Sequence, residues 1–181
     1  MPQDDQFRYY ENYLWFNQFF GDLRQLLTSI HSALKNELSY KILNRGWYYE
    51  KSNHQPSLPP YWMTGISETG FALQSFVVLD PSILEAQPAF DNELSLVFVK
   101  HAQKDKPLWI NEYGLKVLRN DQITQRYDDE RYISGELLNG EEKIPYHAFQ
   151  VPLHIFTTGG DAQRAIQDEV IFVLREMPGW E

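Results

Sequence analysis

The stretch YYENYLWFNQFFGDLRQLLTSIHSALKNEL, residues 9–38, has the clearest periodicity in the chain. Its large apolar side chains recur at alternating steps of four and three residues, which places them on one face of an α-helix. Polar side chains fall mostly on the opposite side, so the stretch predicts an amphipathic helix. The face consists of Tyr9, Tyr13, Phe16, Phe20, Leu23, Leu27, Ile30 and Leu34, and Trp15, Phe19 and Leu26 widen it.

Gly21-Asp22 is the point at which this helix could be divided. A glycine can end one helix and an aspartate can cap the next. The apolar face crosses Gly21 without a change of phase, however, and this favours one continuous helix that tolerates an internal glycine at a cost of about 1 kcal/mol. Asp4 and Asp5 are the candidate N-caps.

The predicted helix is long for the protein that contains it. Residues 7–38 would span about 48 Å, whereas a compact domain of 181 residues is roughly 40 Å across. The helix therefore either curves over a sheet that covers it or extends beyond the body and needs a partner. A second copy is the simplest partner, and the candidate dimer face consists of Phe16, Phe20, Leu23, Leu27, Ile30 and Leu34.

The centre of the chain has the composition of β-strands. Residues 70–79 and 93–99 are rich in branched and aromatic side chains, which predicts two neighbouring interior strands. The connection between them is long enough for an antiparallel return or a parallel crossover. A further strand is expected at 47–50, where Trp47, Tyr48 and Tyr49 follow one another.

The second half of the chain contains two hairpin signals and a helix. The sequence NEYG between apolar residues 108–110 and 115–118 predicts a hairpin, and Asn139-Gly140 predicts another. Residues 146–156 read as a strand, which Pro152 would place at an edge or a bulge. In the last segment, Ile166, Val170, Val173 and Met177 share one side of a helix.

This order of elements predicts an α+β fold, in which a mainly antiparallel sheet of about four to six strands packs against the long N-terminal helix and a C-terminal helix. One domain is expected over residues 1–181, with a helical segment at 1–45, a sheet region at 46–158 and the C-terminal helix at 159–181.

The charge and the cysteine content exclude several classes of function. With 16 basic and 25 acidic residues the net charge is −9, which argues against nucleic acid and suits a basic protein partner. Lys100, Lys104 and Lys106 are expected in a solvated turn. The chain has no cysteine, no apolar run that could span a membrane and no secretory signal, so we expect a cytoplasmic protein.

Catalytic signatures are weak. The five histidines, at 31, 54, 101, 147 and 154, form no metal-ligand pair. The acidic cluster Asp128, Asp129 and Glu130 lacks the spacing of a calcium loop and is expected in solvent. Gly159-Gly160-Asp161 resembles a helix cap more than an anion site. We therefore expect no metal and no cofactor.

One group of side chains suits a binding surface. Five aromatic residues bracket a proline-containing loop expected over residues 52–62, and aromatic side chains are favoured at protein interfaces. The candidate partner-binding residues are Trp47, Tyr48, Tyr49, Tyr61 and Trp62.

The sequence thus favours a non-catalytic interaction or regulatory protein: an acidic adaptor, or a chaperone-like or neutralising binder of a protein partner, forming a homodimer through its long helix. A first alternative is a metal-dependent hydrolase or small-ligand enzyme that uses residues 128–130 with a histidine. A second alternative is a ligand-sensing domain with a pocket between sheet and helix.

Overall fold

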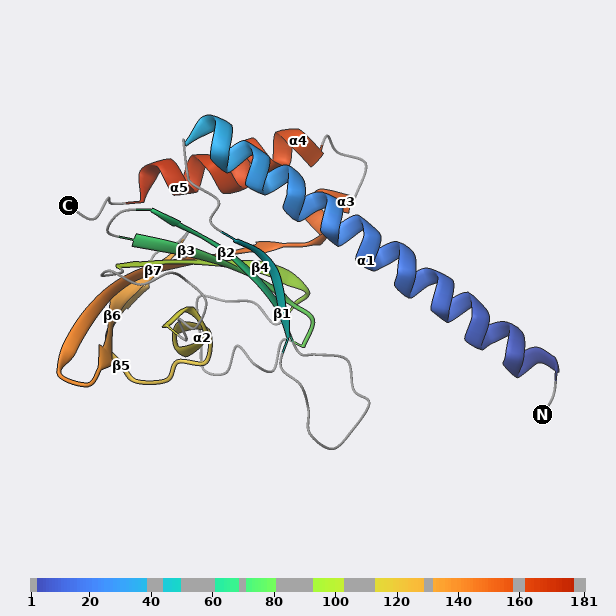
Figure 1. Cartoon of the computed structure of the whole chain (residues 1–181), viewed down its shortest axis with the longest axis horizontal. Coiled ribbons are helices and arrows are strands. Elements are labelled where there is room, and N and C mark those ends of the chain that lie inside the picture. The colour runs from blue at the N-terminus through green and yellow to red at the C-terminus, as the bar shows by residue number, and fades with distance from the viewer. Residues whose placement is uncertain are drawn as a thin grey trace.

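The computed structural model describes residues 3–38, 44–49, 61–68, 71–80, 93–102, 113–128, 132–157 and 162–177. Within these ranges, the backbone but not the side chains is described for residues 3–9, 44–49, 61–68, 125–128 and 157. Helices and an antiparallel sheet occupy separate segments of the chain, which confirms the α+β class. Figure 1 shows a curved sheet between a layer of helices and one short helix.

The first helix, α1 (Gln3–Glu37), is continuous through Gly21, as the phase of its apolar face predicts. It begins at Gln3, so both candidate N-cap aspartates lie inside it. Only its second half packs on the body, and its first half extends into solvent (Figure 1). Of the two alternatives that the length of the helix leaves open, the structure shows the extended one.

Within the described residues the sheet has seven antiparallel strands in the order β1-β2-β3-β4-β7-β6-β5, more than the four to six expected. The 80–92 connection therefore makes an antiparallel return, because β3 and β4 pair directly and antiparallel. The strands are β1 (Asn44–Tyr49), β2 (Tyr61–Glu68), β3 (Phe71–Val78), β4 (Ser95–Ala102), β5 (Ile123–Asp128), β6 (Ile133–Asn139) and β7 (Glu142–Pro152).

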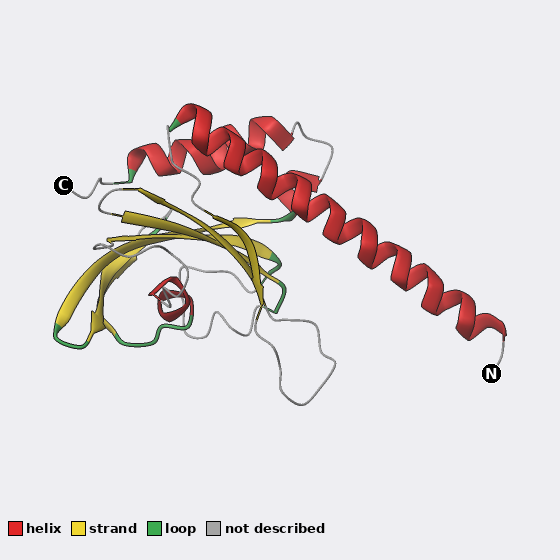
Figure 2. Ribbon diagram, viewed as in Figure 1, coloured by secondary structure: helices red, strands yellow, loops and turns green. Residues whose placement is uncertain are grey.

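One face of the sheet is covered by α1 and by the C-terminal helical segments, as Figure 2 shows. These segments are α3 (His154–Thr157), α4 (Ala162–Ala165), the π-helical η3 (Ile166–Ile171) and α5 (Phe172–Glu176). Successive strand residues point to opposite faces, so alternate residues of the central strands join this core. The core includes Leu27, Ile30, Leu34, Leu73, Leu96, Phe98, Phe149, Val151, Ile166, Val170, Val173 and Met177.

The opposite, concave face holds a second core around α2 (Tyr113–Leu118). Val117 and Leu118 of this helix pack among side chains of β3, β4, β6 and β7. The backbone amide of Gly114 donates a hydrogen bond of 2.8 Å to Oε1 of the buried Gln74. Because both faces of β3 and β4 are buried, these strands are apolar on both sides, as predicted for interior strands.

Three sequence predictions in this region are wrong. Residues 115–118 lie in α2, so they form no hairpin strand after NEYG. The strand β7 is interior, between β4 and β6, and Pro152 is its last residue, where a missing amide costs the ladder little. Tyr61 and Trp62 begin β2 and do not belong to the preceding loop.

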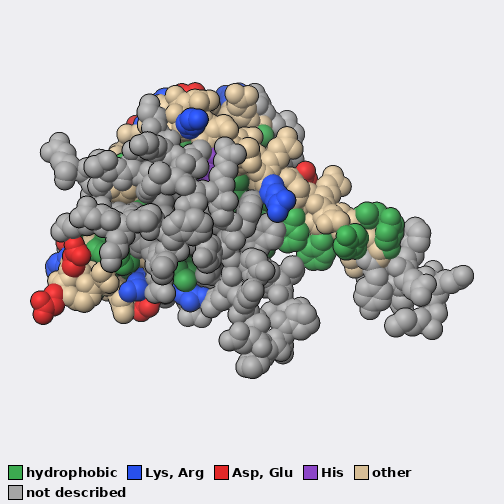
Figure 3. Space-filling model, in the orientation of Figure 1, with side chains coloured by type: hydrophobic (Ala, Val, Ile, Leu, Met, Phe, Trp, Pro, Cys, Tyr) green, Lys and Arg blue, Asp and Glu red, His purple; other side chains and the backbone are tan. Residues whose placement is uncertain are grey.

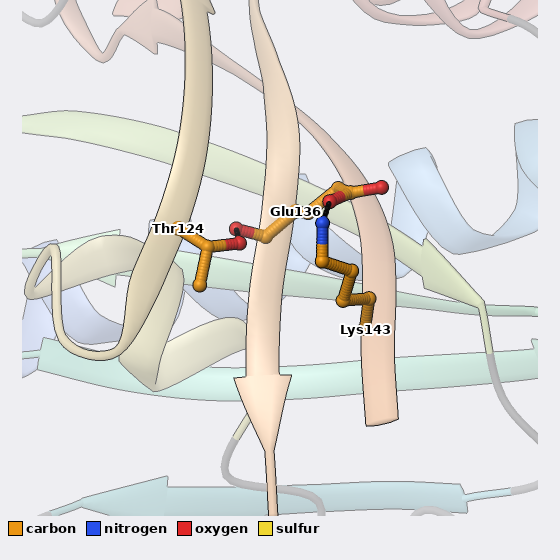
Figure 4. Close-up of polar contacts among 3 residues, drawn as sticks. All are labelled: Thr124, Glu136 and Lys143. Carbon is orange, nitrogen blue, oxygen red and sulfur yellow. Dashed lines mark hydrogen bonds and ion pairs between the residues drawn. The ribbon is translucent and has the colours of Figure 1, made fainter. Parts of the chain in front are cut away.

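The second hairpin prediction is confirmed. Asn139-Gly140 joins β6 to β7, and Gly140 has a φ of 66°, which glycine adopts without a steric penalty. Thr124 Oγ1 donates a hydrogen bond of 3.2 Å to the carbonyl oxygen of Glu136, whose carboxylate lies 2.8 Å from Lys143 Nζ (Figure 4). These contacts join β5, β6 and β7, and the bond to Glu136 raises the pKa of Lys143.

Replacing either of two glycines with alanine tests this packing, because the two replacements are expected to change the free energy of unfolding in opposite directions. A Cβ on Gly114 would collide with the side chain of Gln74, so Gly114→Ala is expected to lower the free energy of unfolding by about 1–3 kcal/mol. Gly21 lies within α1 with no heavy atom within 4 Å of an added Cβ. Gly21→Ala is therefore expected to raise the free energy of unfolding by about 0.5–1 kcal/mol. Urea denaturation of both variants measures the two effects, and equal signs would contradict this packing.

Candidate protein-binding surface

The first half of α1 exposes large apolar side chains. We refer to residues 10–20 as the arm, because this part of the helix extends beyond the sheet (Figure 1). Tyr10 is 60% exposed, Tyr13 61% and Trp15 58%. The space-filling view shows hydrophobic side chains gathered along the arm (Figure 3). Large apolar groups in this number are unusual on the surface of a monomer.

The aromatic side chains of the arm contact one another. Trp15 stacks on Phe19 with ring centroids 5.2 Å apart, and it meets Phe16 edge-on at 5.3 Å. Phe20 lies 6.1 Å from Phe16 and 5.5 Å from Phe19. These contacts hold the rings against the helix, so little side-chain entropy is left to lose on binding.

A groove of about 680 Å³ begins where the arm meets the body. One wall is α1 from Phe19 to Glu37, and the other consists of α3, α4 and the start of η3. Leu23, Phe156 and Ile166 are buried side chains that line it, whereas Ser29 and Gln163 line it from exposed positions. The groove is therefore apolar at its base and polar at its edges.

The wall formed by α1 presents small side chains whose hydroxyl groups are satisfied. Thr28, Ser29 and Ser32 each donate a hydrogen bond of 2.8–3.0 Å to the carbonyl oxygen four residues earlier. At the C-terminal end of α1, Glu37 accepts bonds from Gln167 at 3.3 Å and Arg175 at 2.9 Å. These three hydroxyl groups therefore need no hydrogen-bond partner from a molecule bound in the groove. The contacts of Glu37 connect α1 to the C-terminal helices.

The arm and the groove share a stripe of residues on α1, which we call the second seam. Its members follow one another at steps of 4, 3, 4, 3 and 4 residues, the spacing of one helix-packing face. From Phe19 onward all members line the groove. The second seam consists of Trp15, Phe19, Asp22, Leu26, Ser29 and Ala33.

The predicted dimer face is only partly available. Leu23, Leu27, Ile30 and Leu34 are buried against the sheet and the C-terminal helices, so they belong to the protein's own core and cannot meet a second copy. Phe16 and Phe20 are half-buried at the base of the arm. The sequence did contain the signal for the second seam, since Trp15, Phe19 and Leu26 widen the predicted apolar face.

The other predicted sites are mostly outside what the structure describes. The backbone places Tyr49 opposite Trp62 on β1 and β2, but the side chains of Trp47, Tyr48, Tyr49, Tyr61 and Trp62 are outside the described set. The same holds for the side chain of Asp128 and for Asp129, Glu130, His54 and Gly159-Gly160-Asp161. Within the described ranges, no group of three or more His, Asp or Glu residues could hold a metal ion.

The structure describes neighbours for His147 and His154, the two histidines of the β7 region. His154 Nδ1 lies 3.5 Å from a carboxylate oxygen of the exposed Glu93. His147 is opposite Lys100 in the sheet register and contacts the ring of Tyr132 at 5.8 Å. Burial and the charge of Lys100 lower the pKa of His147.

Lys100 lies inside strand β4, which corrects the prediction of a solvated turn for this residue, whereas Lys104 and Lys106 are outside the described residues. His101 follows Lys100 in the same strand. Lys100 is 3% exposed, and its Nζ lies 4.6 Å from the ring centroid of Phe71, a cation–π contact. Burial lowers its pKa. Two polar residues at the end of an apolar strand are thus covered by neighbouring elements, which sequence periodicity does not reveal.

His101 is fully buried on the concave face beside Tyr113 of α2, with ring centroids 5.4 Å apart. Its Nδ1 lies 3.0 Å from the carbonyl oxygen of Ala102. Burial lowers the pKa of His101 from 6.5 to about 4, although the bond to Ala102 acts in the opposite direction. The imidazole is therefore neutral near pH 7.

Comparison of the chain with protein-family models, with curated proteins and with solved structures finds no match. Among the helices in the described ranges, none combines the length and the apolar character needed to cross a membrane. Proposals about function therefore depend on the surface itself.

The pKa of His101 makes stability depend on pH. The unfolded chain binds this proton near pH 6.5 and the folded chain only near pH 4, so the free energy of unfolding falls by up to about 3 kcal/mol across that interval as pH decreases. His101→Phe removes this contribution. Urea denaturation from about pH 7 to about pH 4 should show a shallower pH dependence for the variant. Parallel curves for the two proteins would contradict a buried neutral imidazole.

Proposed function

We propose that this protein is a non-catalytic interaction module that binds another protein chain through the arm of α1. The observation that supports the proposal is the exposure of Tyr10, Tyr13, Leu14 and Trp15 on a helix that extends beyond its own core. Aromatic side chains of this kind are enriched at the centres of protein interfaces.

The size of the exposed surface supports binding. Large side chains of this type bury roughly 150–250 Å² each. The four exposed residues of the arm are 47–61% exposed, so together they present roughly 400 Å² of mostly apolar surface. Patches of this area on monomers are often functional. The exposed residues also lie on several sides of the helix, a distribution typical of a helix that becomes surrounded.

The net charge of −9 bears on the kind of partner. A basic surface around a binding patch would be attracted to this protein and would associate faster at low salt. An adaptor, a chaperone-like binder and a protein that neutralises a basic partner all have this chemistry. We propose the cytoplasm as the location, since a chain without cysteine is compatible with a reducing compartment.

A photo-crosslinking amino acid tests the proposal directly. With p-benzoylphenylalanine in place of Tyr13, irradiation of cells that produce the protein is expected to join the arm to a defined protein, identified by sequencing the joined peptides. The exposed Glu141, in the turn between β6 and β7, provides a control position away from the arm and the groove. Adding Tyr10→Ser and Trp15→Ser should reduce the yield by about tenfold or more, because hot-spot aromatics dominate such contacts.

Equal products from positions 13 and 141, or a yield unchanged by the two serine substitutions, would refute the proposal. Tyr10 and Trp15 are mostly exposed, so their replacement should leave the fold intact. A circular dichroism spectrum and a urea midpoint matching the parent protein verify this for each variant.

A further inference from the structure

The second seam of α1 is self-complementary when two copies are placed antiparallel. If the midpoint lies at residue 24, Trp15 is opposite Ala33 and Phe19 is opposite Ser29 of the other copy. Each pair joins a large ring to a small side chain, the combination by which facing helices interlock without voids. The large residues are on the arm, and the small residues line the groove.

This antiparallel placement also accounts for the groove. The arm of one copy would lie along residues 28–38 of the other copy, beside the groove of about 680 Å³. The groove has two walls, so an inserted helix contacts α1 on one side and the C-terminal helices on another. Exposed apolar residues on several sides of the arm require a site of this kind.

We propose that the occupant of the groove is the arm of a second copy of this chain, inserted reciprocally to form a two-fold antiparallel dimer. The inference rests on the proposed binding role of the arm and names its partner. In a two-fold dimer each copy contributes its patch and its groove. Two arm patches of roughly 400 Å² each and two grooves of smaller exposed area total roughly 1,200 Å², the lower end of the size range of stable protein interfaces.

One member of the second seam limits the affinity. Asp22 is exposed, lines the groove and would be opposite Leu26 of the other copy. In the same dimer the two Asp22 residues are displaced by four positions, roughly 6 Å along the helix axis. Like charges at this separation repel each other, so Asp22→Asn should tighten the dimer by a few-fold and weaken its dependence on salt.

Sedimentation equilibrium of the purified full chain tests the inference. The parent protein is expected to dimerise. Trp15→Ala should weaken the dimer by tenfold or more, because the substitution removes one Trp15 ring from each of the two symmetric contacts. Ser29→Trp places a second large ring opposite Phe19 and should weaken it similarly. Lys35→Trp adds the same ring at an exposed position of α1 that does not line the groove, so it is the matched control with the parent's affinity. Combining Ser29→Trp with Phe19→Ala restores one large and one small side chain, and should recover dimerisation.

Spin labels report the orientation, because a chain without cysteine accepts a single labelled cysteine at a chosen position. Arg24 and Lys35 are exposed residues of α1. In the antiparallel dimer, the two labels on Arg24→Cys lie at the same position along the helix axis, whereas the two labels on Lys35→Cys are separated by roughly 33 Å along this axis. A parallel dimer would place the two labels at position 35 at the same point along the helix axis, and this result would overturn the inference.

The outcomes separate this inference from the proposed function. A strictly monomeric chain whose residue 13 crosslinks to a different protein refutes the dimer and supports the binding role. A monomeric chain without arm-specific crosslinks refutes both. A dimer that neither Trp15→Ala nor Ser29→Trp weakens refutes the reciprocal arrangement.

Discussion

The burial of one helix face against the sheet holds both layers of this protein together. Leu27, Ile30 and Leu34 of α1 are at most 2% exposed, and they contact side chains of the central strands and of the C-terminal helices. Burying a side chain of this size stabilises the fold by about 1.5–3 kcal/mol. Because these residues occupy only the second half of α1, the position of the anchored half dictates that the first half extends beyond the body.

The concave face depends on a different kind of contact. There, α2 is held under the sheet by apolar packing and by the hydrogen bond from Gly114 to Gln74, two residues 40 positions apart. The same helix helps to bury His101, which keeps its neutral form as a result. The buried side-chain amide of Gln74 and Nδ1 of His101 each have a backbone partner within hydrogen-bonding distance, whereas Nε2 of His101 is buried without a partner among the described residues.

The sequence predicts those elements whose pattern is local. The continuity of α1 through Gly21 follows from its unbroken apolar phase, and the position of β3 and β4 as neighbouring interior strands follows from two mostly apolar runs. The turn at Gly140 follows from the chemistry of an Asn-Gly pair. In each of these cases a few neighbouring residues carry the whole signal.

Other elements are decided by contacts between distant segments. The six residues of α2 are too few to show helical periodicity, and their place under the sheet depends on Gln74. Lys100 and His101 look like the start of a polar turn until the neighbouring strands and α2 cover them. For the candidate site, the sequence identified Trp15 and Phe19 as apolar, but it could not show that the fully buried part of the helix face begins only at Leu23, that Phe19 is half-buried and that Trp15 is exposed.

The separation of α1 into an anchored and an unanchored half has a consequence for the energetics of recognition. A helical segment of about a dozen residues is marginal in water when no tertiary contact supports it, and Gly21, at the junction, contributes a weak helix former. The helicity of residues 10–20 and the occupancy of the proposed binding site are therefore thermodynamically linked. Any condition that melts this segment would reduce the affinity of the proposed contact in proportion to the helical population, while the folded core is left unchanged.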